Sequence, residues 1–175
     1  MKVIGFAGWS GAGKTTLLSR LIPRLIADGL RVSVIKHAHH NFDIDVPGKD
    51  SWVHRQAGAT EVLVTSVNRW ALMHELRGAS EPSLLELLAR MTSVDLVLVE
   101  GFKTEPLRKI EVHRVANAKP TLYPADSWIA GIATDAELEI DLPRAHLDDI
   151  DAVAVMVNRL AMDAEDVFAQ FQAKA

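Results

Sequence analysis

The sequence contains no cysteine, which excludes disulfides, thiolate metal sites and cysteine nucleophiles. It also lacks a long hydrophobic run: the longest purely apolar stretch, Ala152 to Val157, is far below the roughly 18 residues that a membrane span needs. Basic residues are not in excess, because 19 Lys and Arg face 23 Asp and Glu, for a net charge of −4. We therefore expect a cytoplasmic protein with neither a membrane nor a nucleic acid as its partner.

The sequence shows no flexible or stiff linker either, since its 10 Gly and 7 Pro are scattered along the chain. Hydrophobic residues make up 49% of the 175 residues, enough to bury a substantial core. The length is close to that of one ordinary domain. Residues 1–175 are therefore predicted to form a single domain.

The first 36 residues follow the pattern of a β-α-β unit. Val3–Ala7 and Arg31–Lys36 are short apolar runs typical of strands, and Thr15–Ala27 repeats leucine and isoleucine at helical spacing. A helical crossover joins parallel strands. Leu96–Val99 is apolar without alternation, as in a strand that is covered on both faces. These patterns predict an α/β fold with a doubly wound, mostly parallel sheet.

Two further runs, Val62–Val67 and Trp70–Leu76, predict an antiparallel hairpin that turns at Asn68-Arg69. We expect this hairpin at an edge of the sheet. Further helices are expected at residues 50–57, 80–90, 150–160 and 163–173, and further strands at 110–115 and 128–133.

A glycine-rich motif lies between the first strand and the first helix. It fits G-x-x-x-x-G-K-[ST], the phosphate-binding P-loop, and it occupies the position that this motif requires. Its backbone N–H groups, the helix N-terminus and a lysine ammonium would bind phosphates, and a hydroxyl would bind Mg²⁺. The alternative is a simple turn before a core helix. The expected nucleotide-binding residues are Gly8, Trp9, Ser10, Gly11, Ala12, Gly13, Lys14, Thr15 and Thr16.

A P-loop protein also needs a carboxylate on a neighbouring strand to bind the magnesium water shell. Asp95 precedes the 96–99 strand and Glu100 follows it, about 15 Å apart. Ligands bind at the carboxyl ends of the strands in such sheets. Glu100, rather than Asp95, is therefore the expected metal residue; the alternative is a surface glutamate at a strand end.

Four segments together resemble one family: Gly8–Thr16, Lys36–His40, Asp45–Ser51 and Glu100–Lys103. The chain resembles the MobB family of molybdopterin-guanine dinucleotide biosynthesis adaptors over about residues 1–160. The resemblance implies a P-loop NTPase fold and a homodimer that binds GTP and hydrolyses it weakly. It implies molybdopterin or its guanine dinucleotide as a ligand, and as a partner the guanylyltransferase that joins GMP to molybdopterin. It also implies a likeness to dethiobiotin synthetase, in which a Val-Glu-Gly segment supplies a metal-binding Glu at the position of Glu100.

The loop from Lys36 to Ser51 leaves the same sheet edge as the P-loop. We expect Asp45 to reach the magnesium shell or the attacking water, and Lys36, His37 and Lys49 to face the nucleotide or an anionic pterin phosphate. Two alternatives stay open. The loop could be only solvated and polar, or His37, His39 and His40 could bind a transition metal, although adjacent histidines chelate one ion poorly.

Asp135 follows an apolar strand, at the position of the last residue of the usual guanine-binding motif, whose Asn and Lys are absent. It could read guanine or simply end a strand.

The expected catalytic residues are Lys14, Asp45 and Glu100, with GTP and Mg²⁺ as cofactors. Hydrolysis should be slow, because no water-orienting Gln and no arginine finger is evident. The alternatives are a small-molecule kinase, which ordinarily has an Arg-rich lid, and a module that binds its ligand without catalysis.

Overall fold

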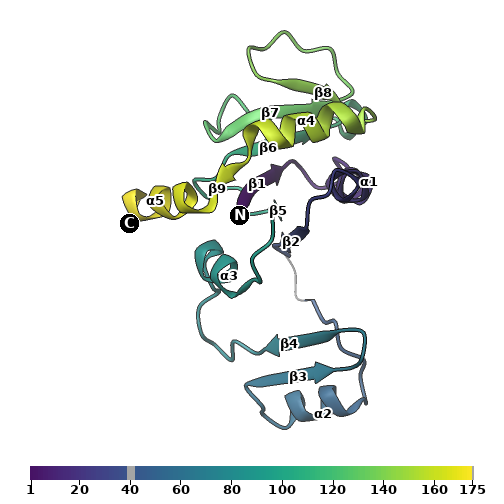
Figure 1. Cartoon of the computed structure of the whole chain (residues 1–175), viewed down its shortest axis with the longest axis vertical. Helices are drawn as coiled ribbons and strands as arrows, with labels where there is room; N and C mark the ends of the chain where they lie inside the picture. Colours follow the sequence, from purple (N-terminus) through teal and green to yellow (C-terminus); the bar gives the residue numbers. More distant parts are fainter. Residues whose placement is uncertain (39–41, 175) are drawn as a thin grey trace. The chain divides into compact units, whose positions relative to one another are not determined.

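The structure is a computed structural model that describes residues 1–38 and 42–174. The chain divides into two compact units (Figure 1). The first unit comprises Met1–His37 and Leu84–Ala175, and the second comprises Ala38–Ser83. No helix in the described part of the chain is both long and apolar enough to cross a bilayer.

The first unit contains a seven-stranded sheet that is mostly parallel (Figure 1). This arrangement confirms the predicted fold class. Two short strands, Arg144–His146 and Met162–Asp163, were not predicted; the second pairs antiparallel with Lys2 and Val3. The strands follow the order β2 (Val32–Lys36), β5 (Leu96–Glu100), β1 (Lys2–Ala7), β6 (Lys109–His113), β7 (Ile129–Thr134) and β8 (Arg144–His146), with β9 (Met162–Asp163) beside β1.

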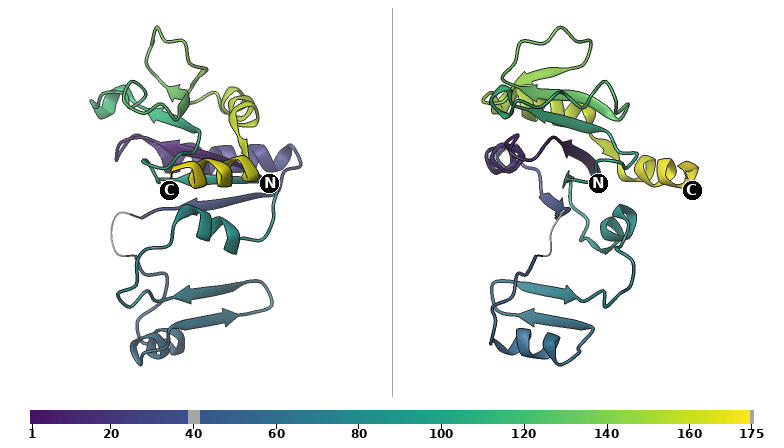
Figure 2. Two further views of the ribbon diagram at one scale, coloured as in Figure 1. Left: turned by 90° about the vertical axis from the view of Figure 1, so that its left-hand side faces the viewer. Right: turned by 180° about the vertical axis from the view of Figure 1, so that it is seen from behind.

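Helices cover both faces of this sheet, as Figures 1 and 2 show. Helices α1 (Lys14–Ala27) and α4 (Ile150–Leu160) pack with Leu98 of β5 in one core cluster. Helices α3 (Leu84–Arg90) and α5 (Ala164–Lys174) contribute to a second cluster, which contains Val97 and Val99. Successive β5 residues thus alternate between two apolar cores, which explains why the strand lacks polar alternation.

Because the long strands of this sheet run parallel, their carboxyl ends meet at one edge. The P-loop follows β1, Glu100 ends β5, and Asp135 follows β7. A short 3-10 turn, η1 (Val115–Asn117), follows β6 at the same edge. Topology alone therefore gathers the predicted nucleotide-binding residues of the first unit.

The second unit consists of helix α2 (Asp50–Gln56) and a hairpin of β3 (Glu61–Thr65) and β4 (Trp70–His74). The antiparallel pairing confirms the predicted hairpin. Its expected place at an edge of the larger sheet is wrong, because β3 and β4 form a separate two-stranded sheet. Helix α2 packs against β3, so the hairpin finds a packing partner within its own unit.

Candidate functional site

The phosphate loop connects the end of β1 at Ala7 to the start of α1 at Lys14, as predicted. Gly13 precedes the helix with φ 91° and ψ 18°, a left-handed conformation that glycine adopts without steric cost. Because glycine has no side chain, Gly13 makes no side-chain hydrogen bond to the first N–H groups of the helix. These groups and the positive end of the helix dipole are free to bind an anion.

Lys14 lies over this loop, where its Nζ donates to the carbonyl oxygens of Gly8 at 2.9 Å and Trp9 at 3.0 Å. Burial is the main cause that lowers the pKa of Lys14, Glu100 opposes this shift, and Lys103 and Lys36 add to it. The ammonium groups of Lys14, Lys36 and Lys103 are thus close enough to affect one another beside the loop. Such a concentration of positive charge at a helix N-terminus suits a polyphosphate.

Thr15 and Glu100 meet beside the loop: Thr15 Oγ1 donates to Glu100 Oε1 at 3.2 Å. Glu100 is 8% exposed, and its Oε2 lies 3.5 Å from Lys36 Nζ. The strand register explains this meeting, because Glu100 pairs with Phe6 just before the P-loop. A hydroxyl and a carboxylate fit Mg²⁺, which binds few protein oxygens and completes its shell with water and phosphate.

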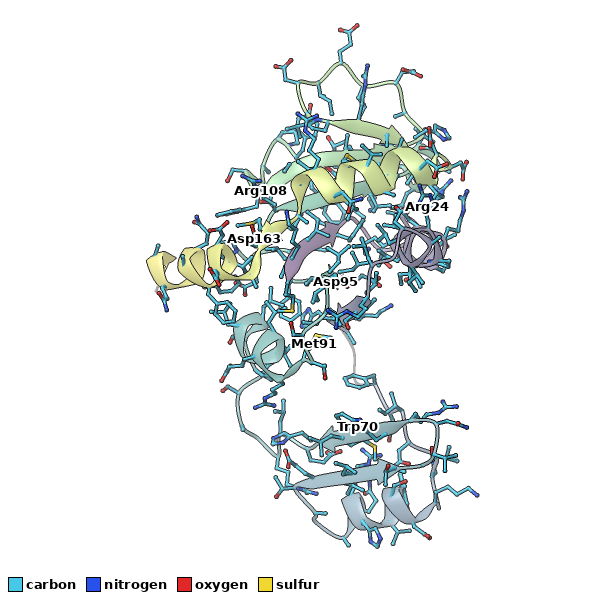
Figure 3. All side chains as sticks on the ribbon, in the orientation of Figure 1. Arg24, Trp70, Met91, Asp95, Arg108 and Asp163 are labelled. Carbon is cyan, nitrogen blue, oxygen red and sulfur yellow. The ribbon has the colours of Figure 1, made fainter. Side chains whose placement is uncertain are left out.

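Asp95, labelled in Figure 3, lies at the opposite end of β5. There it accepts three hydrogen bonds from Arg31. Hydrogen bonds from the Arg31 side chain and backbone lower the pKa of Asp95 to about 2. Asp95 is therefore paired with Arg31, at the end of β5 that is distant from Thr15. The structure agrees with the choice of Glu100 over Asp95 as the acid beside the P-loop.

The segment after β6 forms a second wall of the loop that the sequence did not predict. Trp9 Nε1 donates to the carbonyl oxygen of Pro120 at 2.8 Å, and Asn117 Nδ2 donates to that of Ser10 at 3.1 Å. Lys103 Nζ lies 5.5 Å from the centre of the Trp9 ring, within reach of a cation–π interaction. No motif marks these residues, because more than a hundred positions separate Pro120 and Asn117 from the loop.

Asp135 lies at the predicted edge, but the sequence did not predict its contacts. Its Oδ1 accepts from the backbone N–H of Val115 at 2.8 Å, and its Oδ2 lies 3.6 Å from Arg114 Nη1. Asp135 therefore links the end of β7 to the segment after β6. Its role in reading guanine stays a prediction.

Asp45 belongs to the second unit and binds residues of that unit. It accepts from Ser51 Oγ at 2.8 Å and Arg55 Nε at 3.0 Å. Burial raises its pKa, but the hydrogen bonds from Ser51 and Arg55 outweigh this effect, so that the pKa is lowered overall. Arg55 also binds Asp43 and Glu75, so its guanidinium joins three carboxylates. The proposed contact of Asp45 with magnesium stays a prediction.

The histidine-rich loop is described in part. His39 and His40 lie outside the described residues, whereas His37 donates its backbone N–H to the Glu100 carbonyl oxygen at 2.8 Å. The His37 ring also lies against the Phe102 ring, with the centroids 4.9 Å apart and the ring planes tilted by 36°. Within residues 1–38 and 42–174, no three His, Asp or Glu side chains are placed to bind one metal ion.

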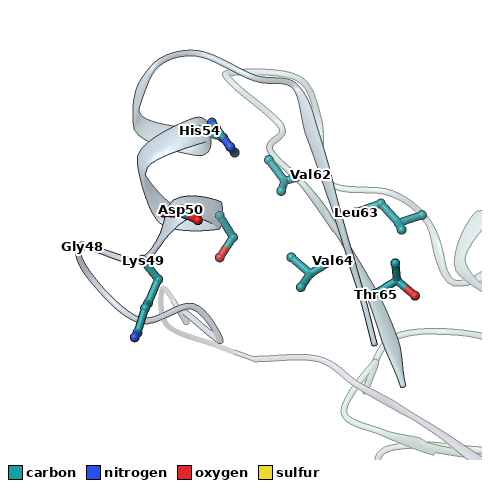
Figure 4. Close-up of a pocket in the computed structure, with 9 residues that line it drawn as sticks. Gly48, Lys49, Asp50, His54, Val62, Leu63, Val64 and Thr65 are labelled. Atoms are coloured by element: carbon teal, nitrogen blue, oxygen red, sulfur yellow. The ribbon is translucent and has the colours of Figure 1, made fainter. Parts of the chain in front are cut away.

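Lys49 precedes helix α2 and lines a cavity of about 660 Å³ between this helix and β3 (Figure 4). His54 and Thr65 line the same cavity, together with the apolar Val62 and Val64. The cavity lies wholly within the second unit. The expected contact of Lys49 with a nucleotide or pterin phosphate stays a prediction.

The parallel sheet, the P-loop motif and the contact between Thr15 and Glu100 define a protein with a fold of the P-loop NTPase type. Residues 3–135 match the family described as molybdopterin guanine dinucleotide synthesis protein B, MobB. The chain belongs to this family. Two relatives of the chain are named as adapter proteins of molybdopterin-guanine dinucleotide biosynthesis.

Individual relatives agree with this assignment. The chain is 46% identical over 155 residues to the molybdopterin-guanine dinucleotide biosynthesis adapter protein of Haemophilus influenzae, covering 87% of this chain and 85% of that one. It is 44% identical over 158 residues to the Escherichia coli protein of the same name, covering 89% and 90%. A crystal structure of molybdopterin-guanine biosynthesis protein B has a TM-score of 0.72 at 25% identity, covering 90% of this chain and 99% of that one.

Proposed function

We propose that this adapter binds Mg²⁺-GTP at its phosphate loop, hydrolyses it slowly and assists the attachment of GMP to molybdopterin. The observation that carries the proposal is the meeting of Thr15 and Glu100 beside the loop that Lys14 covers. A lysine ammonium and the N-terminus of α1 suit the phosphates, while a hydroxyl and a carboxylate suit Mg²⁺. The ion would neutralise phosphate charge when bound.

Guanine as the base is supported by two features. The names of the relatives include guanine dinucleotide, and Asp135 directly follows β7, which is separated from β1 by one strand, β6. A carboxylate can accept from the N1–H and the exocyclic amine of guanine together, which adenine does not offer. Asp135 would have to exchange its contact with Arg114, a 3.6 Å ion pair, for this base contact.

Slow hydrolysis is proposed because the site has electrostatic groups but no evident water-orienting glutamine and no arginine finger. Lys14 and Mg²⁺ would stabilise charge on the phosphates. The fast GTPases add a water-orienting glutamine and an arginine finger. Asp45 is the proposed group near the water, and Lys14 and Glu100 complete the proposed catalytic set.

The proposed partners are the molybdenum cofactor guanylyltransferase, molybdopterin or its guanine dinucleotide, and a second copy of this chain. The hairpin supports the homodimer, because its register places Leu63 opposite Leu72 and Thr65 opposite Trp70. Leu63, Leu72 and Trp70 are all exposed on this face of the hairpin, and Trp70 is 66% exposed. Exposed apolar faces of this kind mark protein contacts. Light scattering of Trp70→Ser should show a shift toward monomer.

Isothermal titration with GTP tests the proposed function. Lys14→Ala should weaken binding about 10- to 100-fold, as expected for the loss of a charge-assisted contact. Lys2→Ala is the matched control, because Lys2 is exposed at the other end of β1. Equal GTP affinity in Lys14→Ala and the wild type would refute binding at this loop. Detection of a phosphorylated acceptor instead of free phosphate would favour a small-molecule kinase.

A further inference from the structure

The side chain of Asn117 lies against the outer half of the phosphate loop, residues 9–11. Its Nδ2 donates to the Ser10 carbonyl oxygen at 3.1 Å. Its Oδ1 lies 2.9 Å from the point where a Cβ on Gly11 would be, and Gly11 has φ 81°. The amide of Asn117 therefore packs on the loop beside Gly11, and a side chain at position 11 would force this amide to move.

The turn that carries Asn117 is fixed to the sheet on both sides. The N–H of Val115 donates to Asp135 Oδ1 at 2.8 Å, which connects the start of η1 to the end of β7. Farther along, Glu111 of β6, only 1% exposed, accepts from the N–H groups of Leu122 at 2.7 Å and Tyr123 at 3.0 Å. Asn117 thus projects from a turn whose two flanks are hydrogen-bonded to neighbouring strands.

Such a contact can restrain the backbone of a phosphate loop. Its backbone N–H groups must turn inward toward the phosphates, which turns carbonyl groups outward. The Ser10 carbonyl lies at the exposed surface, where water could also donate to it. Asn117 Nδ2 donates to it instead, and because Asn117 is fixed in the fold, this bond restrains the peptide in a way that exchanging water does not.

We propose that Asn117 is a positioning residue that keeps the outer half of the phosphate loop in its phosphate-binding conformation. The expected consequence is tighter binding of a nucleoside triphosphate, and this consequence rests on the proposed function. The structural content of the proposal is independent of any ligand: the Ser10–Gly11 peptide is restrained by a side chain more than a hundred residues away in the sequence.

Amide hydrogen exchange of the protein without nucleotide tests the structural content. Asn117→Ala should speed exchange of residues 9–13 by about 2- to 10-fold, the change expected for the loss of one hydrogen bond. Asn117→Asp should act at least as strongly, because a carboxylate then faces the Ser10 carbonyl. The matched control is Asn158→Ala, at an exposed asparagine of α4. Unchanged exchange of residues 9–13 in both Asn117 variants would overturn the inference.

Isothermal titration at 15 °C then tests the consequence for binding. Asn117→Ala should lose about 2- to 10-fold in GTP affinity, with a smaller loss for GMP, because GMP has only one phosphate for the loop to bind. Equal losses for GTP and GMP would overturn the role in phosphate binding. Circular dichroism should show both variants folded. If the wild type fails to bind GTP, the proposed function is refuted, while the exchange result still decides whether Asn117 orders the loop.

Discussion

The substitution Glu100→Gln tests the magnesium site most directly. It keeps the shape of the side chain but removes the charge beside Thr15 Oγ1, 3.2 Å away, and Lys36 Nζ, 3.5 Å away. Glu100 is 8% exposed, so water screens its charge little. Removing a group that supports a bound metal ion costs about 10- to 100-fold in metal affinity. This range corresponds to about 1.4 to 2.8 kcal/mol.

The assay is a magnesium titration of the GTP complex, followed by GTP binding in EDTA. The magnesium midpoint should rise about 10- to 100-fold in Glu100→Gln, while metal-free binding changes little, because Lys14 and the backbone N–H groups are still present. Asp95→Asn is the matched control on the same strand, since Asp95 binds Arg31 at the other end. An equal loss with and without magnesium would refute the role of Glu100 as a metal residue.

Three further predictions concern other groups. Asp135→Ala should reduce the preference for GTP over ATP in competition binding, and a preserved preference would place base recognition elsewhere. Arg55→Met should lower the thermal unfolding midpoint, because it leaves the carboxylates of Asp43, Asp45 and Glu75 without their shared cation; an unchanged midpoint would contradict this role. Arg31 lowers the pKa of Asp95 from 3.8 to about 2, so the stability from this pair is present above pH 3.8 and is lost as the pH falls toward 2. In acid titrations followed by circular dichroism, the folded signal of Asp95→Asn should therefore change less between pH 3.8 and 2 than that of the wild type. Identical curves for the two proteins would contradict the pairing of Asp95 with Arg31.

The core of the site could be predicted because its chemistry is local in the sequence. Residues 8–16 are contiguous, and the glycines, the lysine and the following apolar helix each restrict the backbone over a few residues. Glu100 could be selected over Asp95 because the carboxyl ends of parallel strands share an edge, whatever the detailed packing. The structure agrees on both points, with Thr15 and Glu100 in direct contact.

The rest depended on contacts that no local pattern encodes. Nothing around Asn117 indicates that its side chain will meet Ser10, and the sequence around Asp135 does not reveal its bonds to Val115 and Arg114. The hairpin was predicted from its alternation, but the choice between a separate sheet and an edge of the larger one was not. No cluster of Gly or Pro marks the boundaries of the two compact units.

The sequence by itself determined the parallel α/β fold, the phosphate loop and the acid beside it, because backbone preferences and apolar periodicity act over short stretches. Tertiary structure alone decided which side chains complete the loop and where the hairpin pairs. Those outcomes depend on which strands become neighbours and in what register, and side-chain packing over the whole unit settles both.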